Sequence, residues 1–271
     1  MFGAVDIGGT KTLLATFSSE GELVDKFRFE TPKDYKVFIS ELGKALGQLK
    51  PAKYKIVTVA APGEVDRNRG VVPAFGNLPW QNTPIRDDIE KVYKCPALVE
   101  NDARLAGLSE ALLLKYYRKV LYITISTGIN GGLIIDGSIS PDFETMELGQ
   151  MLFEHDGKLE RWESFASGRA IVQEFGKPAK DIVDPRAWYI IAHNIAIGLI
   201  DLIASMTPDI IVIGGGVGSH FNKFKDRLNE DLQNYTNDLL VLPPIVGAKR
   251  PEDAVIYGCY DLGKVNYDRL S

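Results

Sequence analysis

Residues 2–14 read Phe2-Gly3-Ala4-Val5-Asp6-Ile7-Gly8-Gly9-Thr10-Lys11-Thr12-Leu13-Leu14: an apolar strand, a glycine-threonine turn and a second apolar strand. The pattern recurs at residues 121–135, which read Leu121-Tyr122-Ile123-Thr124-Ile125-Ser126-Thr127-Gly128-Ile129-Asn130-Gly131-Gly132-Leu133-Ile134-Ile135. Consecutive glycines allow positive φ and leave N–H groups unshielded, so such a turn can close around phosphate oxygens. A single turn could equally be an ordinary tight hairpin. Two of them, with a third glycine run at Gly214-Gly215-Gly216, predict a duplicated fold that binds a nucleotide between its halves.

The composition is that of a soluble globular protein. The chain has 271 residues, of which 45% are hydrophobic and 25% charged, enough for two lobes. A net charge of −5 argues against nucleic acid or an anionic membrane as partner. Cys95 and Cys259 lack metal-site spacing and suggest buried thiols in a reducing compartment. Because the first strand begins at Phe2, without a leader-like segment, we expect a cytoplasmic protein.

Periodicity and turn signals predict three strands, a helix, a strand and a helix in that order, twice along the chain. This order is typical of an α/β fold with a mixed sheet in each lobe. We expect a first lobe over residues 1–117 and a second over 118–271, with the last helix packing back on the first lobe. Further expectations are a loop over residues 141–163, a core helix near 186–206, a helix over 220–237, a strand near 240–242 and a final helix over 251–262.

Asp6 ends an apolar strand directly before the first glycine turn. An acid at this place suits Mg²⁺, which carboxylates hold directly or through water beside transferring phosphates. The alternative is an aspartate that bonds to the amides of the turn. Lys11 offers positive charge to phosphates, but it is equally compatible with a solvated surface lysine.

Asn101-Asp102 follows a predicted strand and opens a predicted helix. Asn and Asp are favoured helix N-caps, so capping alone would explain the pair. The partial positive charge of a helix N-terminus also favours an ionised carboxylate. We therefore expect Asp102 to be ionised at neutral pH and able to accept a proton.

Seven short motifs together resemble the ROK family of sugar kinases, within the actin-like ATPase superfamily. They occur in the order of the family and span nearly the whole chain: Asp6-Ile7-Gly8-Gly9-Thr10-Lys11, Ala61-Pro62-Gly63, Glu100-Asn101-Asp102-Ala103, Ser126-Thr127-Gly128-Ile129-Asn130-Gly131-Gly132, Glu147-Leu148-Gly149-Gln150, Glu163-Ser164-Phe165-Ala166-Ser167-Gly168 and Gly214-Gly215-Gly216. The resemblance implies two duplicated, ribonuclease H-like lobes with a cleft between them.

The resemblance also implies roles for individual residues. Asp102 is the expected catalytic base. The expected sugar-binding residues are Gly63, Asn77, Asn101, Asp102, Glu147, Gln150 and Glu163. The expected ATP- and phosphate-binding residues are Asp6, Gly8, Gly9, Thr10, Lys11, Thr12, Thr127, Gly128, Gly214, Gly215 and Gly216, with Asp6 holding Mg²⁺ through water. Trp80 is expected either in a hinge or along the pocket.

The chain departs from the ROK pattern in one segment. Members usually carry a histidine at the position of Gln150, followed by cysteines that bind a structural zinc. Here no cysteine lies between Cys95 and Cys259, and His155 alone does not make a zinc site. We therefore expect no zinc. Since the missing histidine also contacts the sugar in relatives, the departure leaves the identity of the sugar open.

The sequence thus predicts an ATP-dependent hexose kinase that acts on glucose at O6, as a possible homodimer. Alternatives within the family are N-acetylglucosamine, N-acetylmannosamine or fructose as the sugar. A sugar-sensing regulator is a second class, although the strand at Phe2 leaves no room before it for the helix-turn-helix of such proteins. A sugar-independent ATPase is a third.

Overall fold

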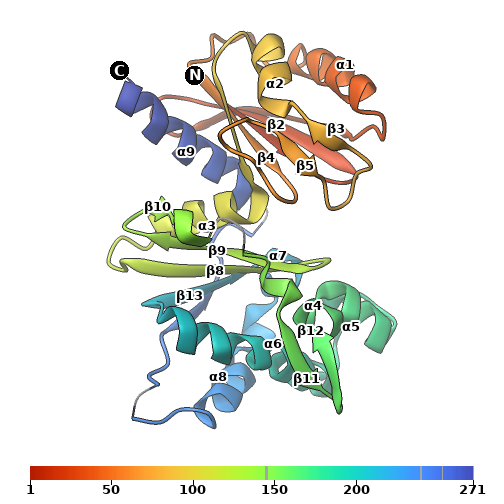
Figure 1. Ribbon diagram of the computed structural model, residues 1–271, viewed down its shortest axis with the longest axis vertical. Coiled ribbons are helices and arrows are strands. Elements are labelled where there is room, and N and C mark those ends of the chain that lie inside the picture. Colours follow the sequence, from red (N-terminus) through yellow and green to blue (C-terminus); the bar gives the residue numbers. More distant parts are fainter. Residues whose placement is uncertain (144–145, 239, 252, 271) are drawn as a thin grey trace. The chain divides into compact units, whose positions relative to one another are not determined.

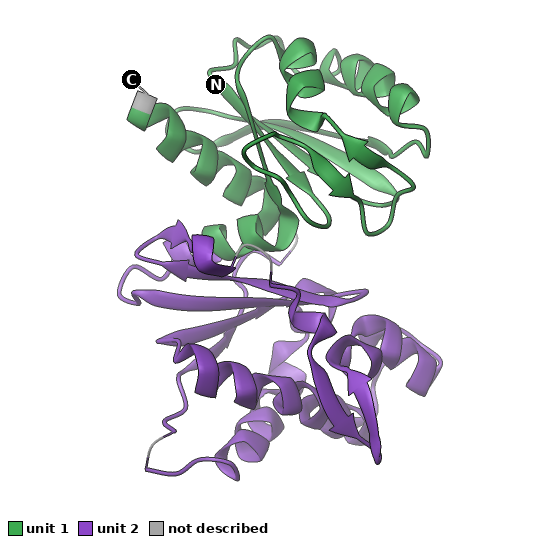
Figure 2. Ribbon diagram, viewed as in Figure 1, with its two compact units in different colours: residues 1–109, 253–271 green, residues 110–252 purple. Residues whose placement is uncertain are grey.

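The computed structural model of the protein describes all residues except 144–145, 239, 252 and 271 (Figure 1). The described chain divides into unit 1, residues 1–109 with 253–271, and unit 2, residues 110–252 (Figure 2). The boundary between the units lies after residue 109, inside a helix, whereas the sequence suggested a boundary after residue 117. The C-terminal helix belongs to unit 1.

Unit 1 is built on a five-stranded sheet with the strand order β3-β2-β1-β4-β7. The strands are β1 (Phe2–Ile7), β2 (Lys11–Phe17), β3 (Leu23–Glu30), β4 (Ile56–Ala61) and β7 (Ala97–Asn101). The first three form an antiparallel meander, whereas β1, β4 and β7 run parallel. The carboxyl ends of the three parallel strands therefore lie at one edge of the sheet.

Helices cover both faces of this sheet (Figure 1). They are α1 (Tyr35–Leu46), α2 (Ile85–Tyr93), the N-terminal part of α3 (Asp102–Leu112) and α9 (Ala254–Leu270); a small hairpin of β5 (Val72–Ala74) and β6 (Gln81–Thr83) completes the unit. Successive strand residues face opposite sides. Val5 therefore packs in the cluster that includes Phe38 of α1, whereas Ala4 packs in the cluster that includes Ile256 of α9.

Unit 2 repeats the same sheet, in the order β10-β9-β8-β13-β14. The strands are β8 (Lys119–Ile125), β9 (Ile129–Ile135), β10 (Ser138–Ile139), β13 (Ile210–Gly214) and β14 (Ile245–Gly247). As in unit 1, the first strand is antiparallel to the second and parallel to the fourth. The predicted duplicated α/β fold is confirmed by this match of strand order and direction.

The long helix α6 (Pro185–Met206) forms the centre of the unit 2 core. It passes for a membrane span by length and composition, yet 56% of its apolar window is buried inside the unit. The other helices are α4 (Trp162–Ala166), α5 (Gly168–Phe175), α7 (Gly215–Gly218) and α8 (Lys225–Gln233). Single 3₁₀ turns lie at Pro141–Phe143, Leu148–Gln150, Ala179–Asp181 and Phe221–Lys223.

Several predicted elements were wrong. Residues 141–163 are not simply a loop, because β11 (Leu152–His155) and β12 (Lys158–Arg161) form a hairpin. Its turn residues Asp156 and Gly157 have φ of 51° and 74°, as a two-residue hairpin turn requires. The last strand lies at Ile245–Gly247 instead of near 240–242, the final helix continues to Leu270, and a 3₁₀ turn followed by the shorter α8 replaces the helix expected over 220–237.

Candidate active site

The first glycine turn, residues 8–10 between β1 and β2, is called turn 1. Gly8 N–H donates to the Lys11 carbonyl at 3.0 Å. The Thr31 hydroxyl donates to the Gly8 carbonyl at 2.8 Å and lies 2.9 Å from the Thr12 hydroxyl. Thr12, expected at the phosphates, is fully buried and supports the turn through Thr31. Thr10 and Lys11 are exposed at the turn.

Asp6 and Asp102 lie at the same edge of the unit 1 sheet. Asp6 pairs in register with Ala60 of β4, and Ala60 pairs with Glu100 of β7, two residues before Asp102. Burial raises the pKa of Asp6 from 3.8 to about 7; the charge of Asp102 acts in the same direction, and Arg28 opposes both. The two aspartates thus carry like charges close together, and a divalent cation would relieve their repulsion.

This pair of acids fits Mg²⁺, which prefers carboxylate and water oxygens. No group of three His, Cys, Asp or Glu side chains among the described residues is arranged to hold a metal ion. An ion at Asp6 would therefore keep most of its water ligands, as Mg²⁺ normally does.

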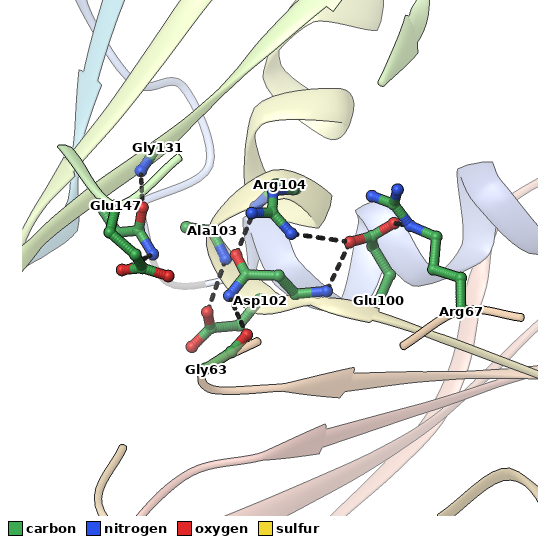
Figure 3. Close-up of polar contacts among 10 residues, drawn as sticks. Gly63, Arg67, Glu100, Asp102, Ala103, Arg104, Gly131 and Glu147 are labelled. Carbon is green, nitrogen blue, oxygen red and sulfur yellow. Dashed lines mark hydrogen bonds and ion pairs between the residues drawn. The ribbon is translucent and has the colours of Figure 1, made fainter. Parts of the chain in front are cut away.

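Asp102 is the first residue of α3, and its Oδ1 accepts the Ala103 N–H at 2.7 Å (Figure 3). Its neighbour Asn101 is fully buried. Asn101 Nδ2 donates to the Gly63 carbonyl at 3.0 Å, and its Oδ1 accepts the Arg104 N–H at 3.2 Å. Gly63 has a φ of 105°, which favours glycine. Asn101 thus ties the Gly63 loop to the N-terminus of α3.

A buried ion cluster beside Asn101 was not predicted from the sequence. Glu100 is 2% exposed; its carboxylate accepts Arg67 Nε at 2.5 Å and the Asn101 N–H at 2.7 Å (Figure 3). Arg104 Nη1 lies 3.6 Å away from the same carboxylate. The signal in the sequence was an acid in an otherwise apolar strand, directly before Asn-Asp. Through Arg67, the cluster anchors the loop that carries Gly63.

Asn77 is exposed next to turn 1, and a Cβ placed on Gly9 would lie 2.6 Å from the Asn77 Cβ. Trp80, for which the sequence left a hinge or a pocket open, is 4% exposed and packs in the core of unit 1. Its Nε1 donates to the Lys33 carbonyl at 2.8 Å, and Lys33 Nζ donates to the Gly9 carbonyl at 3.1 Å. The buried tryptophan thereby positions a lysine at turn 1.

Unit 2 groups the remaining candidate sugar ligands. Gln150 Nε2 donates to Glu163 Oε1 at 2.8 Å. Asn130 Nδ2 donates to Glu147 Oε2 at 3.3 Å, and Asn130 Oδ1 accepts the Gly131 N–H at 2.8 Å (Figure 3). Both acids therefore have an amide partner, which orients their oxygens while leaving further acceptor capacity for hydroxyl groups.

The second glycine turn, residues 126–128 between β8 and β9, is called turn 2, and it borders a pocket of about 560 Å³. The lining of the pocket is Ser126, Thr127, Gly168, Arg169, Val172, Gln173, Pro178, Ala179, Lys180, Gly216 and Val217. Thr127 and Gly216 were predicted at the nucleotide; Arg169 and Lys180 were missed, because nothing in their local sequence marks them. Gly214 and Gly215 contribute close packing, since a Cβ would overlap Tyr122 and the Ile125 carbonyl respectively.

Two copies of one sheet, each with a glycine turn after its first strand, define a two-lobed actin-like ATPase fold, and in unit 1 acids lie at the ends of β1 and β7. The sequence model of the ROK family matches residues 2–265, and the chain belongs to this family. It is an ATP-dependent sugar kinase by class. The expected family and superfamily are thereby confirmed.

Relatives differ in the sugar that their names state. A glucokinase of Streptomyces coelicolor is 24% identical over 96% of both chains. An N-acetylmannosamine kinase of Vibrio cholerae is 29% identical over 94% of this chain and 96% of its own length. The solved ROK family glucokinase of Streptomyces griseus, in complex with glucose and AMPPNP, matches with a TM-score of 0.82 at 24% identity, over 96% of this chain and 98% of that one.

Proposed function

We propose that the protein transfers the γ-phosphoryl group of ATP to O6 of a hexose, with glucose as the first substrate to test. The observation that carries the proposal is the position of Asp102. Asp102 begins α3 at the sheet edge where β1 ends in Asp6-Ile7 and turn 1 follows. An acid there serves an acceptor hydroxyl, and the turn serves the donor phosphates.

In this proposal Asp102 orients the sugar hydroxyl and accepts its proton as the bond to phosphorus forms. Phosphoryl transfer proceeds through a loose transition state, so positioning and charge stabilisation supply most of the catalysis. Mg²⁺ held through water at Asp6 would neutralise the charge on the phosphate oxygens. Turn 1, with Thr10 and Lys11 exposed, and turn 2, with Thr127 exposed, would face the phosphates.

The sugar would be bound by Glu147, Gln150 and Glu163 of unit 2 and by Asn77 of unit 1, because planar acceptors suit neighbouring hydroxyl groups. Asn101, being buried, would act by holding the Gly63 loop, and the backbone of that loop would approach the sugar. The pocket beside turn 2 would take the adenosine, and Arg169 and Lys180 in its lining would supply positive charge for phosphate.

The sugar itself is chosen by Gln150 and its surroundings. N-acetylmannosamine, N-acetylglucosamine and fructose are the alternatives to glucose, and the Vibrio cholerae relative supports the first of them. A cytoplasmic location and a homodimer complete the proposal; light scattering measures the dimer.

The proposal is tested by measuring ADP release from ATP in the presence of each of these sugars in turn. Asp102→Asn should abolish sugar-dependent release while sugar binding persists. Asp184→Asn is the matched control, because Asp184 caps α6 through the Arg186 N–H, and Asn caps equally well. Turnover that survives in Asp102→Asn would exclude Asp102 as the base. ADP release without sugar would identify an ATPase, and sugar binding without any turnover a sugar sensor.

A further inference from the structure

In each unit, a glycine of the glycine turn (turn 1 or turn 2) lies directly against a side chain that the proposed function assigns to the sugar. In unit 1 the pair is Gly9 and Asn77, and in unit 2 it is Gly128 and Glu163. In the proposal the glycines belong to the donor side of the reaction and their partners to the acceptor side. The two halves of the reaction thus meet inside each unit.

The contact in unit 1 involves the base of the side chain. A Cβ on Gly9 would lie 2.6 Å from the Cβ of Asn77 and 3.4 Å from the backbone carbonyl oxygen of Asn77. An Asn Cβ moves only with its backbone, so any side chain at residue 9 would displace the whole Asn77 loop. The missing side chain at Gly9 is therefore what allows Asn77 to sit at turn 1.

The contact in unit 2 involves the tip of the side chain. A Cβ on Gly128 would lie 2.7 Å from Glu163 Oε2, with the next atom of that side chain at 3.9 Å. The other oxygen, Oε1, is held by Gln150. A methyl group at residue 128 would therefore rotate the carboxylate and break its bond with Gln150, while the backbones could stay in place.

Two other glycines show that this contact is specific. A Cβ on Gly149 would also meet Glu163 Oε2, at 2.9 Å, but it would overlap the Ile129 carbonyl as well, at 2.5 Å. A Cβ on Gly43, in helix α1 and outside the proposed sites, would meet nothing within 4 Å. Gly128 is thus the site where added volume reaches the acid alone, and Gly43 is its matched control.

We propose that Gly9 and Gly128 are positioning residues for the sugar, which set Asn77 and Glu163 and couple sugar affinity to the state of the phosphate turns. The inference rests on the proposed function, which assigns these two side chains to the sugar. Because coupling between two ligands is reciprocal, nucleotide binding at turn 2 would alter sugar affinity through Glu163, and sugar binding would alter nucleotide affinity equally.

The test measures the dissociation constant of the best sugar substrate by calorimetry, with and without AMPPNP, for the wild type, Gly128→Ala and Gly43→Ala. Gly128→Ala should weaken sugar binding without nucleotide about tenfold, the loss expected for one hydrogen bond to a charged group. The effect of AMPPNP on sugar affinity should shrink in the same variant. Gly43→Ala should bind sugar as the wild type does, with and without AMPPNP.

A double-mutant cycle separates positioning from general damage. Glu163→Asp shortens the acid, so Gly128→Ala should cost less sugar affinity in the Glu163→Asp background than in the wild type. Full additivity would overturn the inference, as would wild-type sugar affinity in a folded Gly128→Ala protein or an equal loss in Gly43→Ala. A wild type that binds no sugar would instead overturn the proposed function, and the inference with it. Gly9→Ala tests the pair in unit 1 by the same measurement. Because the Asn77 loop would have to move, this variant should also weaken sugar binding.

Discussion

Gln150 donates a hydrogen bond from its amide nitrogen to Glu163 Oε1 at 2.8 Å. The two residues come from different elements of unit 2, the 3₁₀ turn Leu148–Gln150 and helix α4. A neutral amide does not titrate, so the orientation of Glu163 is held by a partner whose charge is the same at every pH. Gln150 is also the residue at which we expect the chain to depart from the ROK pattern.

The Gln150–Glu163 bond should be visible in the kinetics. Gln150→Ala should raise KM for the sugar about tenfold with a smaller effect on kcat, because the acid loses its orientation. Gln150→Glu should be worse, since two carboxylates would then face each other. Steady-state rates at saturating ATP measure both, with Gln233→Ala on the exposed end of α8 as control. Unchanged sugar KM in Gln150→Glu would exclude a contact between this pair and the sugar.

The raised pKa of Asp6 predicts a pH-dependent stability. A carboxyl group that titrates at 3.8 in the unfolded chain and at about 7 in the folded one binds more protons when folded between these values. The free energy of unfolding should therefore fall as pH rises from about 4 to about 7. Asp6→Asn removes this loss, so the variant should be more stable than the wild type at pH 8, by at most about 4 kcal/mol, and similar at pH 4.

Calorimetric Tm values at both pH values, without divalent ions, measure the effect. Mg²⁺ with a nucleotide at pH 8 should then stabilise the wild type more than Asp6→Asn, because the ion compensates the ionised carboxylate. The variant should also lose sugar kinase activity. An equal Tm difference at pH 4 and pH 8 would show that the carboxyl group of Asp6 does not titrate in this range.

The buried cluster of Glu100 with Arg67 predicts a stability effect of a different kind. Arg67→Ala should lower the free energy of unfolding by about 3 kcal/mol, because it removes a partner of a buried carboxylate. Arg69→Ala, in the same loop, should change it little, since Arg69 is exposed and 4.0 Å from Asp66. Urea unfolding compares the two variants. Equal effects would mean that the loop, and not the charge pair, determines the loss.

The pocket beside turn 2 predicts a separation of the two substrates. Lys180→Ala should raise KM for ATP about tenfold, the effect of one charge-assisted contact, and leave KM for the sugar unchanged. Lys177→Ala removes an exposed lysine that is not among the pocket residues and is the matched control. A change in KM for the sugar instead of KM for ATP would contradict the placement of the nucleotide in this pocket.

Local sequence was sufficient for elements that carry their own signals. The two glycine turns, the capped start of α3 at Asp102 and the apolar core helix α6 were all readable, because turn chemistry, caps and periodicity are local. The hairpin β11–β12 carried such a signal in Asp156-Gly157 and was missed although it was present. The position of β14 was not local, since its neighbour β13 decides which residues pair.

By itself, the sequence determined the class of fold, the duplication and the residue types available for the chemistry. Only the tertiary structure decided what each side chain does. It buried Asn101 and Thr12, which the motifs suggested as ligands, and it joined Arg67 to Glu100 across 33 positions of the chain. It also brought Gly128 against Glu163. Burial and contact depend on how sheets and helices pack, and residues far apart in sequence carry no local mark of the partner they will meet.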